Sequence, residues 1–333
     1  MKTENLPSAQ EGQSLGQGLV FRRFFTKPDA HPLDEIKYAK RSSVITNPDG
    51  SVVFKMENVE VPESWSQLAT DIIVSKYFRK AGVPETGSEV SARQVVYRIA
   101  HSIRVAGERL GGYFKTAGDA QTFEEEMLHL LIRQKCAFNS PVWFNCGMDL
   151  YGIQGSGGSF YWDPATDAIR QSADSYSNPQ CSACFIQSVD DNLMSIFELI
   201  KNEARLFKYG SGTGTNFSKL RGRQEKLSSG GTSSGLMSFL EVLDRGAGAT
   251  KSGGTTRRAA KMVCLDLDHP EIMDFINWKV REEKKVAALI AAGYSSDFNG
   301  EAYKTVAGQN SNSSVRISDE FMRAYLNDGK WQT

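Results

Sequence analysis

Two cysteines three positions apart, Cys181 and Cys184, are the first residues whose type and spacing could do chemistry. Such a pair can be half of a zinc site, a thioredoxin-like redox pair or a single reactive thiol with a neighbour. Structural zinc needs a second ligand pair, and the remaining cysteines stand alone. A thioredoxin-like pair opens a helix, whereas Phe185 and Ile186 indicate a strand. If both cysteines lie on that strand they face opposite sides, so we expect no disulfide between them. The lone cysteines are Cys136, Cys146 and Cys264.

Three stretches rich in glycine, serine and threonine follow within about fifty residues, at 210–214, 228–235 and 251–256. The first has a helical pattern before it and a strand pattern after it, which is the wrong order for a dinucleotide-binding turn. A tight turn explains it equally well. The third leads into Arg257 and Arg258, and exposed backbone amides beside paired arginines favour phosphate. Together the stretches predict a nucleotide- or phosphate-binding surface.

An acidic group after an apolar run could bind a metal or could start a helix. Pro270 within it favours the helix start, so we predict a structural role and no metal site. The group comprises Asp266, Asp268, His269 and Glu271.

The elements that must position these residues fall into three segments. Residues 1–18 are polar and are expected to be a disordered tail. Residues 19–150 are predicted to be mainly helical, after a hairpin that turns at 47–50. Two capping-box patterns mark helix starts there, Ser91 with Gln94 and Thr122 with Glu125. Residues 150–180 are expected to form a long surface loop that enters the segment 151–333.

From residue 181 onward, strand and helix patterns alternate. Alternation of this kind predicts parallel strands with helical crossovers, in either a barrel or a doubly wound sheet. The expected strands and helices are 183–189, 193–207, 215–220, 236–243, 262–268, 272–278, 313–317 and 319–326.

Composition restricts the function classes. The 333 residues include 39 Lys and Arg against 39 Asp and Glu, so no basic field favours nucleic acid or a membrane surface. No apolar run reaches the about 18 residues of a membrane span, and the first residues lack a signal-peptide core. Hydrophobic residues make up 40%, enough for a sizeable core. We expect a cytoplasmic protein of about two domains.

The motifs taken together resemble the large chain of ribonucleotide reductases. The matching blocks include FNSPVWFNCG (138–147), CSACFIQSVDD (181–191), LFKYGSGTGTNFSKLR (206–221) and GATKSGGTTRRAAKMVCLDLDHPEIMDFINWK (248–279). The amino-acid sequences of these blocks are similar to those of the adenosylcobalamin-dependent, class II branch of the family. The resemblance implies an α/β fold, with a helical N-terminal region followed by the first part of a ten-stranded α/β barrel.

The resemblance also implies the chemistry. In that family a thiyl radical initiates replacement of the ribose 2′-hydroxyl by hydrogen, and two further cysteines supply electrons and become a disulfide. Cys184 matches the first of these reducing thiols, and Cys181 would be a bystander. The positions that match substrate contacts, here for a ribonucleoside diphosphate, are Ser140, Ala183, Cys184 and Gly212.

An allosteric site is implied as well, for a deoxynucleoside triphosphate effector at a homodimer interface. Positive side chains and the start of a helix suit a triphosphate there. The matching residues are Asp191, Asn192, Leu193, Lys208 and Arg221. The segment that relays effector identity to substrate choice matches Lys251, Gly253, Gly254, Arg257 and Arg258.

One departure from the family is as informative as the match. The radical cysteine of the family lies in an Asn-Pro-Cys-x-Glu motif, which this sequence lacks, as it lacks the second reducing cysteine. We also expect no N-terminal regulatory ATP-cone, because only about 18 residues precede the matching region. We expect a split-gene product or a truncated frame that is inactive without a C-terminal reductase fragment, which would carry most adenosylcobalamin contacts. The alternatives are a non-catalytic nucleotide-binding remnant and an unrelated CxxC redox protein.

Overall fold

The computed structural model describes residues 17–46, 50, 52–228, 230–250, 259–297 and 300–333. Contacts divide the chain into two compact units, residues 1–181 and 182–333. The segment after residue 150 therefore belongs with the helical unit up to Cys181. Within the described residues, no helix has both the length and the apolar character needed to cross a membrane.

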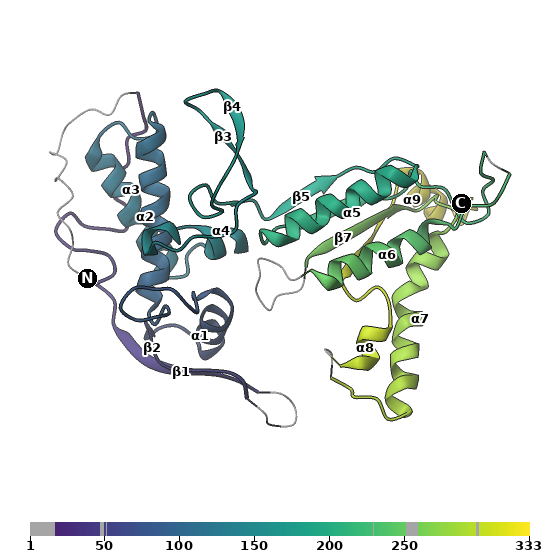
Figure 1. Ribbon diagram of the computed structural model, residues 1–333, viewed down its shortest axis with the longest axis horizontal. Helices are drawn as coiled ribbons and strands as arrows, with labels where there is room; N and C mark the ends of the chain where they lie inside the picture. Colours follow the sequence, from purple (N-terminus) through teal and green to yellow (C-terminus); the bar gives the residue numbers. More distant parts are fainter. Residues whose placement is uncertain (1–16, 47–49, 51, 229, 251–258, 298–299) are drawn as a thin grey trace. The chain divides into compact units, whose positions relative to one another are not determined.

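The first unit starts with a long antiparallel hairpin, as expected. Strands β1 (Tyr38–Thr46) and β2 (Val52–Pro62) pair from Tyr38 opposite Pro62 to Thr46 opposite Val52 (Figure 1). The hairpin leads into α1 (Gln67–Ile72) and a π-helical turn, η1 (Ile73–Tyr77). Val59 and Val61 of β2 are fully buried and join the core that the following helices complete.

Two longer helices form the centre of this unit. Helix α2 (Ala92–Leu110) begins at the expected capping box, in which Ser91 accepts from the Arg93 amide and Gln94 reaches back. Helix α3 (Ala117–Ile132) begins earlier than expected, at Thr116, whose capping box uses Asp119. The second predicted box was therefore wrong: Thr122 and Glu125 lie inside α3 and are buried. Short helices α4 (Ser140–Asn145) and η2 (Asp149–Tyr151) follow.

The expected long loop at 150–180 contains a second hairpin, β3 (Phe160–Asp163) and β4 (Ala168–Gln171). The turn is closed by Asp163, whose carboxylate accepts from the Ala165 amide and from the Thr166 hydroxyl. Local side-chain bonds of this kind stabilise a turn within a polar sequence that has no apolar alternation to reveal its strands.

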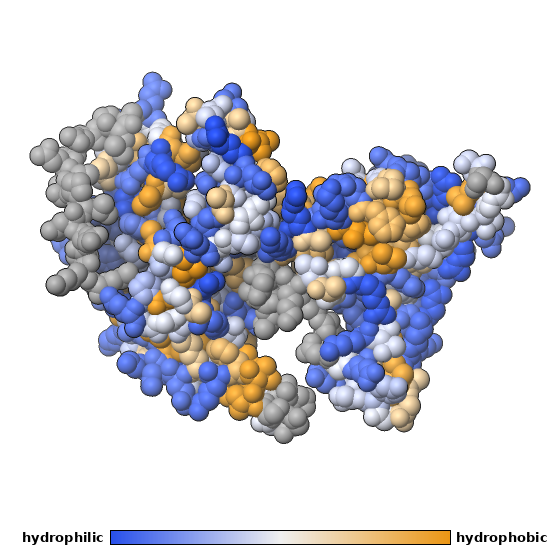
Figure 2. All heavy atoms as spheres, in the orientation of Figure 1, coloured by the Kyte–Doolittle hydropathy of each residue, from blue (hydrophilic) through white to orange (hydrophobic). Residues whose placement is uncertain are grey.

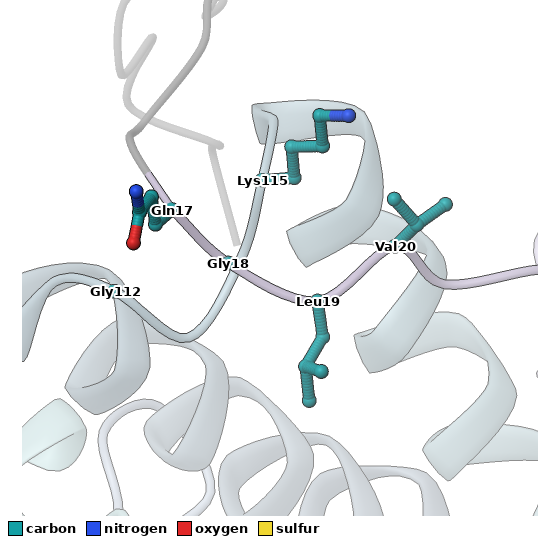
Figure 3. A pocket seen from close by; sticks show the side chains of 6 residues that line it. All are labelled: Gln17, Gly18, Leu19, Val20, Gly112 and Lys115. Carbon is teal, nitrogen blue, oxygen red and sulfur yellow. The ribbon is translucent and has the colours of Figure 1, made fainter.

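The predicted disordered tail, residues 1–18, lies mostly outside the described residues. Gly18 is described, and its Cα lies so close to the Phe114 backbone that any side chain would collide. The next residue, Leu19, forms backbone hydrogen bonds with Tyr113 and Lys115. Figure 3 shows this strand-like segment bordering a shallow surface pocket that Lys115 and Gly112 also line.

Among the described residues of the second unit, strands and helices alternate, and four strands form one parallel sheet in sequence order. The expected helix at 319–326 has the predicted bounds, while α6 (Leu236–Ala249) and α7 (Ile272–Ala291) are longer than expected. The second expected strand, 215–220, starts earlier, so Gly212 and Gly214 lie within β6 (Gly212–Asn216). The elements are β5 (Cys184–Gln187), α5 (Leu193–Lys208), β6 (Gly212–Asn216), α6 (Leu236–Ala249), β7 (Lys261–Asp266), α7 (Ile272–Ala291), α8 (Glu301–Thr305), β8 (Ser311–Arg316) and α9 (Asp319–Leu326).

The two faces of this sheet differ. Helices α5, α6 and α7 pack on one face, where Val263 and Leu265 of β7 are almost fully buried (Figure 1). The side chains that alternate with them point to the other face, which is open: Met262 is 48% exposed, and Ile186 of β5 is 95% exposed. A parallel sheet ordinarily has both faces covered by other elements. In this sheet, one of the two faces is not covered by the described residues.

Candidate functional site

Cys184 is the first residue of β5 and lies on the open face of the sheet. It pairs with Gly212 of β6, in the same row of the sheet. A Cβ on Gly212 would come within 3.0 Å of the Ala260 carbonyl oxygen and 3.5 Å of the Cys184 sulfur. Glycine at this position therefore leaves space beside the thiol, which is exposed.

Backbone bonds fix the segment that leads into Cys184. The Gly212 amide donates to the Ala183 carbonyl at 2.6 Å, and the Ser211 hydroxyl donates to the Ser182 carbonyl at 2.7 Å. Three predicted substrate-contact residues are thus neighbours: Cys184 and Gly212 on adjacent strands, and Ala183 directly before β5. Strand β5 is shorter than the expected strand at 183–189. Cys181 lies three residues before it, so the opposite-faces argument does not apply to the pair.

Ser140, the fourth predicted substrate contact, belongs to the first unit. It is the first residue of α4, and its hydroxyl lies 3.1 Å from the Tyr77 hydroxyl. Pro141 follows in the first turn, where the missing N–H costs nothing. The structure thus holds the Ser140 side chain through Tyr77.

Four of the five predicted effector residues meet at the start of α5. Arg221 donates from Nε to the Asp191 carboxylate at 2.6 Å, and its backbone amide donates to the same carboxylate at 3.3 Å. Asn192 caps the helix by accepting from the Ser195 amide, and Leu193 is the first helical residue. A helix N-terminus beside a guanidinium is an arrangement that binds phosphate groups.

Lys208, the fifth, is not brought to this place within one chain. It is the last residue of α5, and Leu193 is the first. At 1.5 Å per residue the two ends of the helix are about 22 Å apart. The predicted specificity segment, Lys251, Gly253, Gly254, Arg257 and Arg258, lies outside the described residues.

The acidic group after β7 makes internal contacts. His269 donates from Nε2 to the Leu220 carbonyl, at 2.7 Å, and accepts the Glu271 amide on Nδ1. Glu271 accepts the amide of Leu236, the first residue of α6, at 2.6 Å. Asp266 accepts from Asn216 and pairs with Arg316. In the part of the chain that the structure describes, no three His, Cys, Asp or Glu side chains are grouped as metal ligands.

Two features escaped the sequence patterns. Lys261, at the start of β7, is fully buried and forms an ion pair at 2.6 Å with Glu203 of α5, which also accepts from the Thr213 hydroxyl. Burial lowers the pKa of Lys261, and the Glu203 carboxylate opposes that shift. No periodic pattern in the sequence indicates this pair, because Lys261 and Glu203 are 58 positions apart. The second feature is the contact of Cys181 with Cys146 of the same unit.

Comparisons with known proteins agree with the two units. Residues 182–333 match the family described as ribonucleotide reductase, barrel domain, and residues 39–134 match class II vitamin B12-dependent ribonucleotide reductase. The first match begins where the second unit begins.

Three curated relatives illustrate the extent of the similarity. The vitamin B12-dependent ribonucleotide reductase of Rhodopirellula baltica is 46% identical over 95% of this chain and 30% of its own length. The enzyme of the same name from Agrobacterium fabrum is 42% identical over 93% and 32%. The vitamin B12-dependent ribonucleoside-diphosphate reductase of Thermoplasma acidophilum is 28% identical over 80% and 33%. The chain spans about a third of the length of these relatives. It belongs to the class II, vitamin B12-dependent ribonucleotide reductase family and corresponds to an N-terminal portion of that protein.

Proposed function

We propose that this chain supplies the effector site, one reducing thiol and the first strands of the ten-stranded barrel of a ribonucleoside-diphosphate reductase. The observation that carries the proposal is the position of Cys184, an exposed thiol beside Gly212 on the uncovered face of a parallel sheet. A parallel sheet with helices on one face, and with β5 and β8 at its ends, supports the proposal that this unit is a segment of a barrel. Closing the barrel would turn Cys184 inward.

The proposed role of Cys184 is to give electrons. Reduction of a ribonucleotide to a deoxyribonucleotide releases water and oxidises two thiols to one disulfide. Cys184 supplies one thiol; the other thiol and the radical cysteine would come from a C-terminal part. Ser140, Ala183 and Gly212 would contact the substrate, a ribonucleoside diphosphate, through a hydroxyl and backbone groups.

Adenosylcobalamin is the cofactor proposed for the complete protein, where it would generate the radical. A corrin is large and flat and needs an enclosing surface. On β5, both Cys184 and Ile186 are exposed, which makes an open surface and not a pocket. The open surface of β5 does not by itself fit the cofactor, so most of its contacts are assigned to the complement, and we derive no step through it.

The second proposed role is allosteric binding of a deoxynucleoside triphosphate at the start of α5. The helix N-terminus and Arg221 provide donors and positive charge. Next to them, the first turns of α5 expose the apolar residues Leu193, Met194 and Phe197, and Figure 2 shows apolar surface over this helix. A homodimer through this surface would cover them. In an antiparallel arrangement of two α5 helices, the partner's Lys208 would approach the phosphates.

The allosteric role predicts a specific loss of affinity. Arg221→Ala should weaken deoxynucleoside triphosphate binding, measured by calorimetry, by about 1–3 kcal/mol because a charge-assisted contact is removed. Arg316→Ala, which removes an exposed guanidinium paired with Asp266, is the matched control and should leave the affinity unchanged. Equal affinities of Arg221→Ala and the unmodified chain would refute the assignment.

The catalytic role has its own test in an assembled enzyme. Cys184→Ser should abolish multiple turnover driven by a dithiol, while Cys181→Ser should retain most of it. Only a thiol that forms the disulfide with its distant partner can be recycled by exchange. Effector binding without any turnover, even with the complement bound, would instead favour a nucleotide-binding remnant.

A further inference from the structure

Two thiols that the proposed reduction does not use are in contact in the first unit. The sulfur of Cys146 lies 3.4 Å from the sulfur of Cys181, 35 positions along the chain. Cys146 is the C-cap residue that follows α4 and is 4% exposed, whereas Cys181 is exposed just before the second unit begins. One thiol of the pair is therefore open to solvent-borne reagents and the other is shielded.

Cys146 is held in place by a buried guanidinium. Arg98, 1% exposed, donates to the Cys146 carbonyl at 2.7 Å and to the Trp143 carbonyl at 2.8 Å. Its position is fixed in turn by an ion pair with Glu89, which is fully buried. The backbone that carries the Cys146 thiol is thus anchored from inside the unit.

Cys181 is anchored from the other side. The Asn145 side-chain amide donates to the Gln180 carbonyl at 2.8 Å, which fastens the incoming segment to the end of α4. The Cys181 thiol also lies 3.4 Å from the Pro179 carbonyl. Both sulfurs are therefore positioned by bonds that do not depend on a disulfide, and bond formation between them requires little ordering of the chain.

The two thiols also differ in acidity. The hydrogen bond between the two thiols lowers the pKa of Cys181. The same interaction, together with burial, raises the pKa of Cys146. Cys181 is thus the thiol that becomes a thiolate first, and thiolates are the attacking species in exchange reactions.

We propose that Cys146 and Cys181 form a second redox-active dithiol, with Cys181 as the attacking thiol and Cys146 as the resolving thiol. The Cys181 thiolate attacks a small-molecule disulfide, forms a mixed disulfide and releases one thiolate. Cys146 then loses its proton and attacks the Cys181 sulfur, which releases the second small thiol. In total, two protein thiols and one small disulfide become one protein disulfide and two small thiols.

Such a bond would have a structural consequence close to Cys184. It would close the segment from 146 to 181, which contains the β3–β4 hairpin. It would also tie down the chain three residues before Cys184. The dithiol would therefore couple the redox state of the surroundings to the segment that enters β5.

The test uses the full chain and oxidised glutathione, and it needs neither cofactor nor reductase activity. After treatment and alkylation, two of the five cysteines should be protected, and peptide mapping should find Cys146 joined to Cys181. Cys146→Ser should instead accumulate a stable glutathione adduct on Cys181, because the resolving thiol is gone. Cys136→Ser and Cys264→Ser, which leave the pair intact, should form the 146–181 bond as the unmodified chain does.

Two results would overturn the proposal. One is a Cys181–Cys184 disulfide as the main product, which would make the CxxC motif the redox pair. The other is an unresolved glutathione adduct on Cys181 in the unmodified chain. Should Cys146→Ser fail to fold, the map of the unmodified chain decides by itself.

Discussion

The two units bury polar groups in the same way but differ in how their hydrophobic surfaces are covered. Each encloses one ion pair at 2.6 Å, Arg98 with Glu89 in the first and Lys261 with Glu203 in the second. In the first unit, a hairpin and helices surround the core that contains Val59 and Val61. In the second, helices cover one face of the sheet, and the face that carries Cys184 is open. The difference indicates that stability is local to each unit, whereas the proposed chemistry needs a further structure over the open face.

The largest expected effect comes from breaking the buried ion pair of the first unit. Arg98→Met leaves Glu89 without its partner and removes the donors to the Cys146 and Trp143 carbonyls. We expect a loss of about 3–5 kcal/mol in the free energy of unfolding of this unit. Hydrogen exchange, followed separately in α2 and in α5, should show the loss in α2.

A matched control for this substitution is Arg93→Met on the same helix. Arg93 pairs with Asp34 at a partly exposed position, where ion pairs contribute about 0–1 kcal/mol. Equal effects of the two substitutions would show that Arg98 does not stabilise the first unit in the way described.

A smaller expected effect is a difference in stability between substitutions on the two faces of the sheet. Leu265 and Met262 lie on the same strand, β7, and point to opposite faces. Leu265→Ala on the covered face should lower the free energy of unfolding by about 2–5 kcal/mol, because it leaves a cavity. Met262→Ala on the open face should change it by less than about 0.5 kcal/mol. Urea denaturation of both variants measures the difference, and a large loss for Met262→Ala would contradict an open face.

The smallest effect is a difference in the pH at which thiols of the two units react. The pKa of Cys181 is lowered by its neighbour Cys146, and burial raises the pKa of Cys264 in the second unit. Because the thiolate is the reactive form, alkylation by iodoacetamide should begin at lower pH for Cys181 than for Cys264. Mass spectrometry of alkylated peptides across a pH series measures both. Cys146→Ala, which removes the hydrogen-bonding neighbour, should move the Cys181 profile to higher pH, and an unchanged profile would remove the basis for the asymmetry.

Elements of the fold could be predicted from the sequence where a short sequence motif alone specifies the local structure. The first hairpin, the Ser91 capping box and the helix at 319–326 all have such signals. The alternation after residue 181 predicted parallel strands, and the structure confirms them. A capping-box pattern is short, however, and Thr122 with Glu125 matched it by chance inside a helix that starts at Thr116.

In the candidate site, too, residues close together in the sequence could be predicted, whereas contacts between distant residues could not. Asp191, Asn192 and Leu193 are consecutive, and their grouping with Arg221 followed from family resemblance. The expected helix at 193–207 already placed Lys208 at the far end from Leu193, and the structure confirms that separation. The Cys146–Cys181 contact and the Lys261–Glu203 pair join residues 35 and 58 positions apart, and they exist only because separate elements pack together.

Ribonucleotide reduction by the purified chain, with and without a complement, tests the central claim most directly. The complement would be a polypeptide from the Rhodopirellula baltica relative that begins after the matched region. The assay supplies adenosylcobalamin, a dithiol, a ribonucleoside diphosphate and a deoxynucleoside triphosphate. We predict no product from the chain alone and product when the complement is added, with Cys184→Ser inactive in the same mixture. Sustained turnover by the 333-residue chain alone would contradict the account, because the chain would then need nothing over its open sheet face.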